Sequence, residues 1–112
     1  MIKPAVLNQN KDFRRLYWRG KSTAHPVLVC YVMRNRTGAC RVGITASKKI
    51  GKAVKRNRAR RIIREAYRQL KPKINGNWDI VLVARAKTVF SKSTKVATVM
   101  QDQFVELGLM KL

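Results

Sequence analysis

Apolar residues recur at two different spacings along this chain, and the change between them separates predicted helices from predicted strands. The stretch from Asn10 to Arg19 has helical spacing, with apolar side chains at Phe13, Leu16 and Tyr17. Asn10 is a residue type that caps helix starts, and Gly20 is one that ends helices. We therefore expect a first short helix over this stretch.

A longer helix is predicted from Gly51 to Leu70. Its apolar residues can lie on one face and bury against a core: Val54, Ile62, Ile63, Ala66 and Tyr67. Lys71 precedes Pro72, and the residue before a proline is pushed out of the helical region. The helix is therefore expected to end there.

A closing amphipathic helix is predicted from Lys92 to Met110, with Ser91 or Ser93 as its cap. The apolar face is expected to contain Val96, Val99, Met100, Gln103 or Phe104, and Leu107. This pattern predicts a third helix as the last element of the chain.

Three runs of β-favouring residues predict strands: Val27 to Met33, Cys40 to Ala46 and Trp78 to Ala84. A short strand near Lys21 to Thr23 is expected to precede them. Residues 34–38 have turn chemistry, so the first two long strands are predicted to form an antiparallel hairpin. Both faces of the first long strand are apolar, which predicts that other elements cover it on both sides.

The elements follow one another in the order α-β-β-β-α-β-α. The succession of strand, helix and strand from Val42 through Leu70 to Ala84 indicates a parallel crossover. At 112 residues the chain suffices for one core but not for two. We predict a single domain, residues 1–112, of the α/β class (α+β, two layers) with a four-stranded sheet.

Charge then narrows the function. The chain has a formal net charge of +21, and the stretch from Ser47 to Arg68 contains ten basic side chains and a single acid, Glu65. This concentration predicts a polyanionic partner. Because 46% of the residues are hydrophobic and fall in periodic blocks, a folded domain is expected rather than a disordered basic tail.

The arginines of the long helix are arranged regularly. Arg56, Arg60, Arg64 and Arg68 recur every four residues, which places them along one stripe beside Lys55, Arg58 and Arg61. Arginine forks match phosphate oxygens. The alternative, an ordinary solvated face, normally mixes charges of both signs, but only Glu65 is near enough to pair, with Arg61 or Arg68.

Residues for protein-based catalysis are scattered. A single histidine, His25, offers no acid–base pair. The five acids are spread along the chain and form no cluster for metal binding: Asp12, Glu65, Asp79, Asp102 and Glu106. Cys30 and Cys40 are expected to be free thiols that pack as small hydrophobic side chains. A metal site is not expected, because two cysteines alone lack partner ligands. With no signal-like N-terminus and no long apolar run, a cytoplasmic protein without membrane contact is expected.

The segment from Arg41 to Arg68 reads R-V-G-I-T-A-S-K-K-I-G-K-A-V-K-R-N-R-A-R-R-I-I-R-E-A-Y-R. It closely resembles the signature of the bacterial ribonuclease P protein subunit family. The resemblance extends more loosely over the chain, including D-F at Asp12 and D-I-V-L-V-A-R from Asp79. It implies a ribosomal protein S5 domain 2-like fold with a left-handed β-α-β crossover, contrary to the usual right-handed rule.

The resemblance also implies partners and a site. The partners would be the catalytic RNA of ribonuclease P and precursor tRNA, with no obligate protein partner, and Mg²⁺ would be held mainly by the RNA. The chain would assist removal of the 5′ leader. Contact with RNA would involve Lys48, Lys49, Lys52, Arg56, Asn57, Arg58, Arg60, Arg61, Arg64 and Arg68. A cleft for the single-stranded leader would comprise Phe13, Tyr17, Val29, Tyr31, Thr45 and Lys49.

Three alternatives follow from the residues alone. Unpaired bases stack on aromatic faces, but a stripe such as Phe13 and Tyr17 is more often part of a core. The charge would equally suit a non-catalytic RNA-binding protein of ribosomal type. Sequence-specific DNA binding is less favoured, since no second helix of a helix-turn-helix precedes the basic helix.

Overall fold

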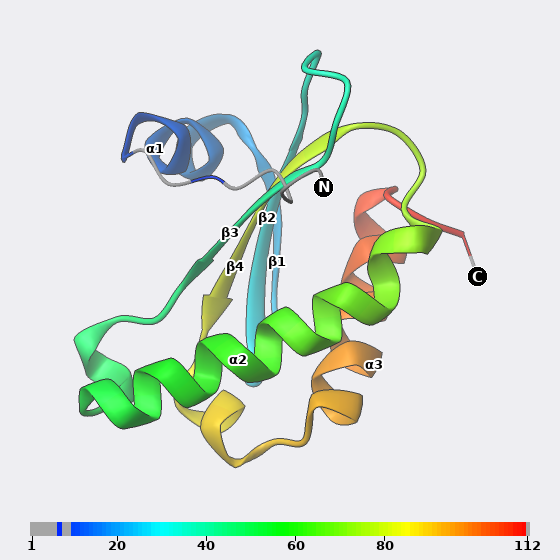
Figure 1. Cartoon of the computed structure of the whole chain (residues 1–112). Helices are drawn as coiled ribbons and strands as arrows, with labels where there is room; N and C mark the ends of the chain where they lie inside the picture. The colour runs from blue at the N-terminus through cyan, green and yellow to red at the C-terminus, as the bar shows by residue number, and fades with distance from the viewer. Residues whose placement is uncertain (1–6, 8–9, 112) are drawn as a thin grey trace, which may run out of the picture.

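The computed structural model describes Leu7 and residues 10–111, and its elements follow the predicted order. Figure 1 shows the helices packed around one sheet. The helices are α1 (Asn10–Arg19), α2 (Ala53–Leu70) and α3 (Ser93–Leu107), and the strands are β1 (Lys21–Ala24), β2 (Leu28–Arg34), β3 (Arg41–Thr45) and β4 (Trp78–Ala84). Three short 3₁₀ turns are η1 (Lys48–Ile50), η2 (Lys71–Lys73) and η3 (Ala86–Phe90).

The strand order in the sheet is β1-β2-β4-β3, so the predicted hairpin of β2 with β3 is wrong. β4 lies between them, antiparallel to β2 and parallel to β3. The reason is burial: β4 is buried along nearly its whole length and takes a partner on each edge. Asn35, in the turn expected to close the hairpin, instead donates to the carboxylate of Asp79 on β4 at 2.7 Å.

The parallel crossover from β3 through α2 to β4 is confirmed. In Figure 1 both strands run downward, β4 lies to the right of β3, and α2 passes in front of the sheet. A right-handed crossover would move to the left in this view. The connection is therefore left-handed, as the family resemblance implied.

Both faces of the sheet are covered, as the apolar pattern of β2 predicted. On one face Cys30, Val32, Ile80 and Leu82 pack in the main core with residues of α2 and α3 such as Ile63 and Phe104. On the other face Val81 packs with Leu16 of α1, beside Phe13, Tyr31, Met33 and Val83. The helix α1 thus lies on the side of the sheet opposite α2.

Two expectations for α2 are wrong. The helix begins at Ala53 rather than at Gly51, since Gly51 has φ +137°, outside the helical region. Val54 is 80% exposed rather than buried, because the first turn of α2 projects past the strands (Figure 1). Ala59, which the pattern did not single out, is fully buried.

The closing helix differs in its cap. Lys92 is the N-cap residue and makes no side-chain cap, whereas Ser91 Oγ donates to the carbonyl of Lys87 at 2.8 Å. Both Gln103 and Phe104 are buried. Gln103 Nε2 donates to the Leu28 carbonyl at 2.9 Å, which ties α3 to β2.

Asp79 connects α1, β3 and the turn before β3 to the central strand. Its side chain is 1% exposed and accepts hydrogen bonds from Arg41 Nε at 2.8 Å, Arg41 Nη2 at 2.7 Å and Arg15 Nη2 at 2.9 Å. Burial acts to raise the pKa of Asp79, but hydrogen bonds from Arg41 and Asn35 and the nearby arginine charges outweigh it. The net effect lowers the pKa, so the folded state favours the charged carboxylate.

Replacing the Asp79 carboxylate is expected to cause a pH-dependent loss of stability. Asp79→Asn is expected to lower the free energy of unfolding at pH 7 by about 1.5–3 kcal/mol, the range for hydrogen bonds to charged groups. Because the folded pKa is depressed, this contribution is fully present above the unfolded value of about 3.9 and is lost progressively as pH falls through the lower folded pKa. Urea unfolding should therefore separate variant and wild type most at pH 7, and the difference should shrink as pH falls below about 3.9.

The matched control is Asp102→Asn, which removes an exposed carboxylate on α3. It should leave the free energy of unfolding at pH 7 within about 0.5 kcal/mol of wild type. An equal effect of both variants would contradict the role assigned to Asp79.

Candidate nucleic-acid interface

A groove of about 910 Å³ follows the open edge of the sheet at β3, between α1 and α2. Because β3 has a strand neighbour only on its β4 side, the groove reaches residues on both faces of the strand. It is lined by Leu7, Phe13, Tyr17, Val42, Ile44, Thr45, Ala46, Ser47, Arg60, Arg64, Tyr67, Arg68, Lys71 and Val83. One wall is aromatic and aliphatic, and the other is a row of basic side chains.

The aromatic wall is held by packing between α1 and the sheet. The rings of Tyr17 and Tyr31 meet edge to face, with centroids 4.8 Å apart. Gly43 of β3 lies directly under Phe13, since a Cβ there would lie 2.6 Å from Phe13 Cε1. Burial raises the pKa of Tyr17, against a lowering hydrogen bond with Thr45, so its phenol is neutral at physiological pH.

The basic wall consists of successive turns of α2. Arg60, Arg64 and Arg68 line the groove, and Lys71 extends the row into η2. Glu65 pairs with Arg68 at 3.3 Å, rather than with Arg61, and Arg68 is largely exposed. In the described part of the chain, Arg60 and Arg64 form no salt bridge. These guanidinium groups are therefore available to phosphates.

The sequence-predicted residues lie in three places. Of the predicted leader cleft, Phe13, Tyr17 and Thr45 line the groove. Val29 and Tyr31 lie on the sheet face that α1 covers, but they do not line the groove. In the strand register, Val29 of β2 pairs with Val83 of β4, and Val83 pairs in turn with Thr45 of β3. The exposed lysines Lys48, Lys49 and Lys52 lie at and just after η1, outside the groove lining.

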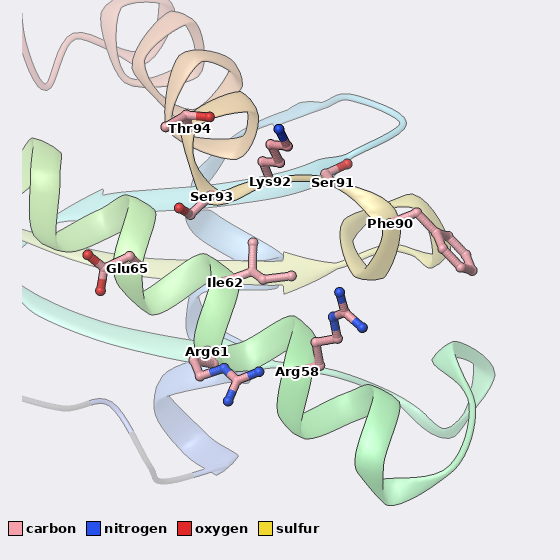
Figure 2. Close-up of a pocket in the computed structure, with 9 residues that line it drawn as sticks. All are labelled: Arg58, Arg61, Ile62, Glu65, Phe90, Ser91, Lys92, Ser93 and Thr94. Atoms are coloured by element: carbon pink, nitrogen blue, oxygen red, sulfur yellow. The ribbon is translucent and has the colours of Figure 1, made fainter.

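The predicted RNA-binding arginines divide between two sides of α2. Arg60, Arg64 and Arg68 face the groove that also contains the aromatic residues. Arg58 and Arg61 instead line a second hollow, which η3 and the start of α3 also border, and in Figure 2 the Arg58 side chain extends toward η3. Arg56 is half-buried, and the exposed Asn57 accepts a hydrogen bond from Arg60 at 3.1 Å. Part of each predicted set therefore lies in the same groove, and the rest of each set lies outside it.

Comparison with known proteins identifies the family. The family model described as Ribonuclease P matches residues 1–107. The chain belongs to the ribonuclease P protein family. Among its relatives, the ribonuclease P protein component of Clostridioides difficile (strain 630) is 48% identical over 83 residues, which cover 73% of each chain. That of Pelotomaculum thermopropionicum is 49% identical over 80 residues, 71% of each chain.

Solved structures of ribonuclease P proteins share the fold. The chain matches the Staphylococcus aureus protein with a TM-score of 0.83 at 30% identity, covering 97% of this chain and 100% of the other. It matches the Thermotoga maritima protein with a TM-score of 0.75 at 29% identity, covering 86% and 91%. The predicted family and the mixed α/β fold with a four-stranded sheet are thereby confirmed, and ribonuclease P is the enzyme of tRNA 5′ maturation.

The sequence pattern does not reveal several groove residues. Tyr67 is predicted to bury against the core and is only 6% exposed, yet it also lines the groove. Val42 and Ile44 line it too, although their alternation by itself predicts only a strand. Knowledge that β3 is an edge strand would have identified them, but that depends on where β4 inserts.

The titratable side chains of the described residues form no metal-binding cluster, and the buried Cys30 thiol is not ionised. Among the described residues no three His, Cys, Asp or Glu side chains gather closely enough to hold a metal ion. Cys30 and Cys40 are both free, and burial raises the pKa of the Cys30 thiol to about 12, which keeps it protonated. In the same part of the chain, no helix is long and apolar enough to cross a membrane.

The close approach at Gly43 gives a prediction for the groove. Gly43→Ala would bring Cβ to 2.6 Å from Phe13 Cε1 and 2.9 Å from the Leu7 carbonyl oxygen, so α1 must shift. Overpacking of this kind costs about 1–3 kcal/mol of stability, measurable by urea unfolding. In a Phe13→Ala background only the contact with the Leu7 carbonyl remains, so Gly43→Ala should cost less stability there than in the wild-type chain. Equal costs in both backgrounds would show that Phe13 does not rest on Gly43.

Proposed function

We propose that this chain binds the catalytic RNA of ribonuclease P and holds the single-stranded 5′ leader of precursor tRNA in the groove between α1 and α2. The observation that carries the proposal is the make-up of the groove. Its wall at α1 presents Phe13 and Tyr17, and its wall at α2 presents Arg60 and Arg64. Together they match the two parts of an unpaired nucleotide, the base and the phosphate.

The shape of the groove favours a single strand. Unpaired bases expose the faces that stack on aromatic rings, whereas a duplex hides them within its own stack. The groove follows the edge of one strand, β3, so an extended chain of nucleotides would lie along it with phosphates toward α2. Backbone contacts of this kind are insensitive to sequence, which suits leaders of different sequence.

We further propose that Mg²⁺ and the cleavage chemistry belong to the RNA. The carboxylates of this chain do not fit a magnesium site, since Asp79 is saturated by Arg15, Arg41 and Asn35. Asp12 lies against Arg15, and Glu106 accepts from Thr23 Oγ1 at 3.0 Å. The net charge of +21 would serve to screen repulsion between the phosphates of the two RNA molecules.

A non-catalytic RNA-binding protein of ribosomal type would use the same charge without needing the aromatic wall. One measurement therefore distinguishes the two functions: how much the 5′ leader adds to the affinity for precursor tRNA. In a holoenzyme reconstituted with the catalytic RNA, Phe13→Ala and Tyr17→Ala, which each remove an aromatic ring from the groove lining, should weaken binding of leader-bearing precursor tRNA by about fivefold to 100-fold. This corresponds to about 1–3 kcal/mol for each stacked base. Binding of tRNA without a leader should not change.

The matched control is Trp18→Ala, which removes the most exposed aromatic residue of α1, at 87% exposure, from a position outside the groove lining. It should leave the leader-dependent part of the affinity as in wild type. If Phe13→Ala and Tyr17→Ala behave like this control, the leader does not bind in the groove and the ribosomal-type function is favoured.

A further inference from the structure

A second hollow of about 770 Å³ lies on the side of α2 opposite the groove. Figure 2 shows its lining, which comes from α2 and from the segment that joins η3 to α3. The residues are Arg58, Arg61, Ile62, Glu65, Phe90, Ser91, Lys92, Ser93 and Thr94. Its volume lies in the range of ligand-binding clefts, about 300–1,000 Å³.

The most unusual residue of this hollow is Phe90. It is 82% exposed, whereas the preceding Val89 is 5% exposed and Thr88 is fully buried. At this exposure the face of the Phe90 ring is open to a stacking partner such as an unpaired base.

The backbone that carries Phe90 is anchored. Thr88 Oγ1 donates to the carbonyl of Val27 at 2.5 Å and accepts from the Arg85 N–H at 2.9 Å. The Ser91 N–H donates to the Thr88 carbonyl at 3.0 Å, closing the turn around Phe90. The ring is thus presented on a fixed turn, which lowers the entropy lost when a ligand stacks on it.

The charges of the hollow are unbalanced. Within the described residues, Arg58 and Arg61 form no salt bridge, and the one acid of the lining, Glu65, pairs with Arg68. In Figure 2 the Arg58 side chain extends from α2 toward the turn that carries Phe90. An exposed aromatic ring beside unpaired guanidinium groups fits a base with its flanking phosphate.

We propose that this hollow binds one unpaired nucleotide of the catalytic RNA, with its base on Phe90 and its phosphate on Arg58 and Arg61. The inference rests on the proposed function, because it takes the catalytic RNA as the partner of α2. The catalytic RNA is favoured over the leader because α2 itself stands between this hollow and the groove, whose arginines are Arg60 and Arg64. The two sides of one helix would then contact two different RNA strands.

Salt-dependent binding to the catalytic RNA alone, without precursor tRNA, tests this assignment. Phe90→Ala should weaken binding about fivefold to 100-fold at every salt concentration, because stacking releases no counterions. The slope of log K against log salt should stay unchanged. Arg58→Ala should instead reduce the magnitude of that slope by about 0.7–0.9, the value for one phosphate. Phe90→Trp, which keeps an aromatic face, should retain wild-type affinity.

Trp18→Ala serves as the exposed-aromatic control and should bind the catalytic RNA as wild type does. If Phe90→Ala matches this control, the nucleotide site is refuted, while leader-dependent binding through the groove would still stand. If Phe90→Ala weakens only the binding of leader-bearing precursor, the occupant is the substrate and the assignment to the catalytic RNA is wrong. If the wild-type chain does not bind the catalytic RNA, the proposed function fails together with the site.

Discussion

The insertion of β4 between β2 and β3 is the constraint on which the rest of the structure depends. It makes β3 an edge strand, with α1 on one face of the sheet and α2 on the other. The groove exists because both helices border this edge. Asp79, at the start of β4, fastens the arrangement by pairing with Arg15 of α1 and Arg41 of β3. The same strand therefore organises the core and positions the candidate site.

The basic residues of α2 remain available because packing uses a different part of the helix. Ala59, Ile63, Ala66 and Leu70 are buried, and the arginines project on either side of this apolar stripe. One side meets the aromatic residues of α1, and the other meets Phe90. With a net charge of +21, the protein has far too few acids to balance these groups. Two RNA strands around one helix would supply the missing negative charge.

Much of the fold could be predicted from the sequence, because its elements have clear periods: β4 and α1 have the predicted bounds. Strand pairing could not, since turn chemistry around Asn35 is local while the insertion of β4 is a long-range choice. The cap of α3 and the exposure of Val54 also depend on tertiary position. For the site, charge identified the basic helix, but how its arginines divide depends on its rotation against the sheet. Phe90 lies in a 3₁₀ turn without periodic pattern, so nothing in the sequence singled it out.

The central claim is that this protein supplies RNA binding while the RNA supplies the chemistry. Reconstitution at low Mg²⁺ tests it most directly, by measuring cleavage of precursor tRNA with the catalytic RNA alone, the protein alone and both together. The account predicts efficient 5′ leader removal only when both are present, since the basic protein replaces the screening that high Mg²⁺ would provide. Metal-dependent cleavage by the protein alone, or no rescue of the RNA by the protein, would contradict it.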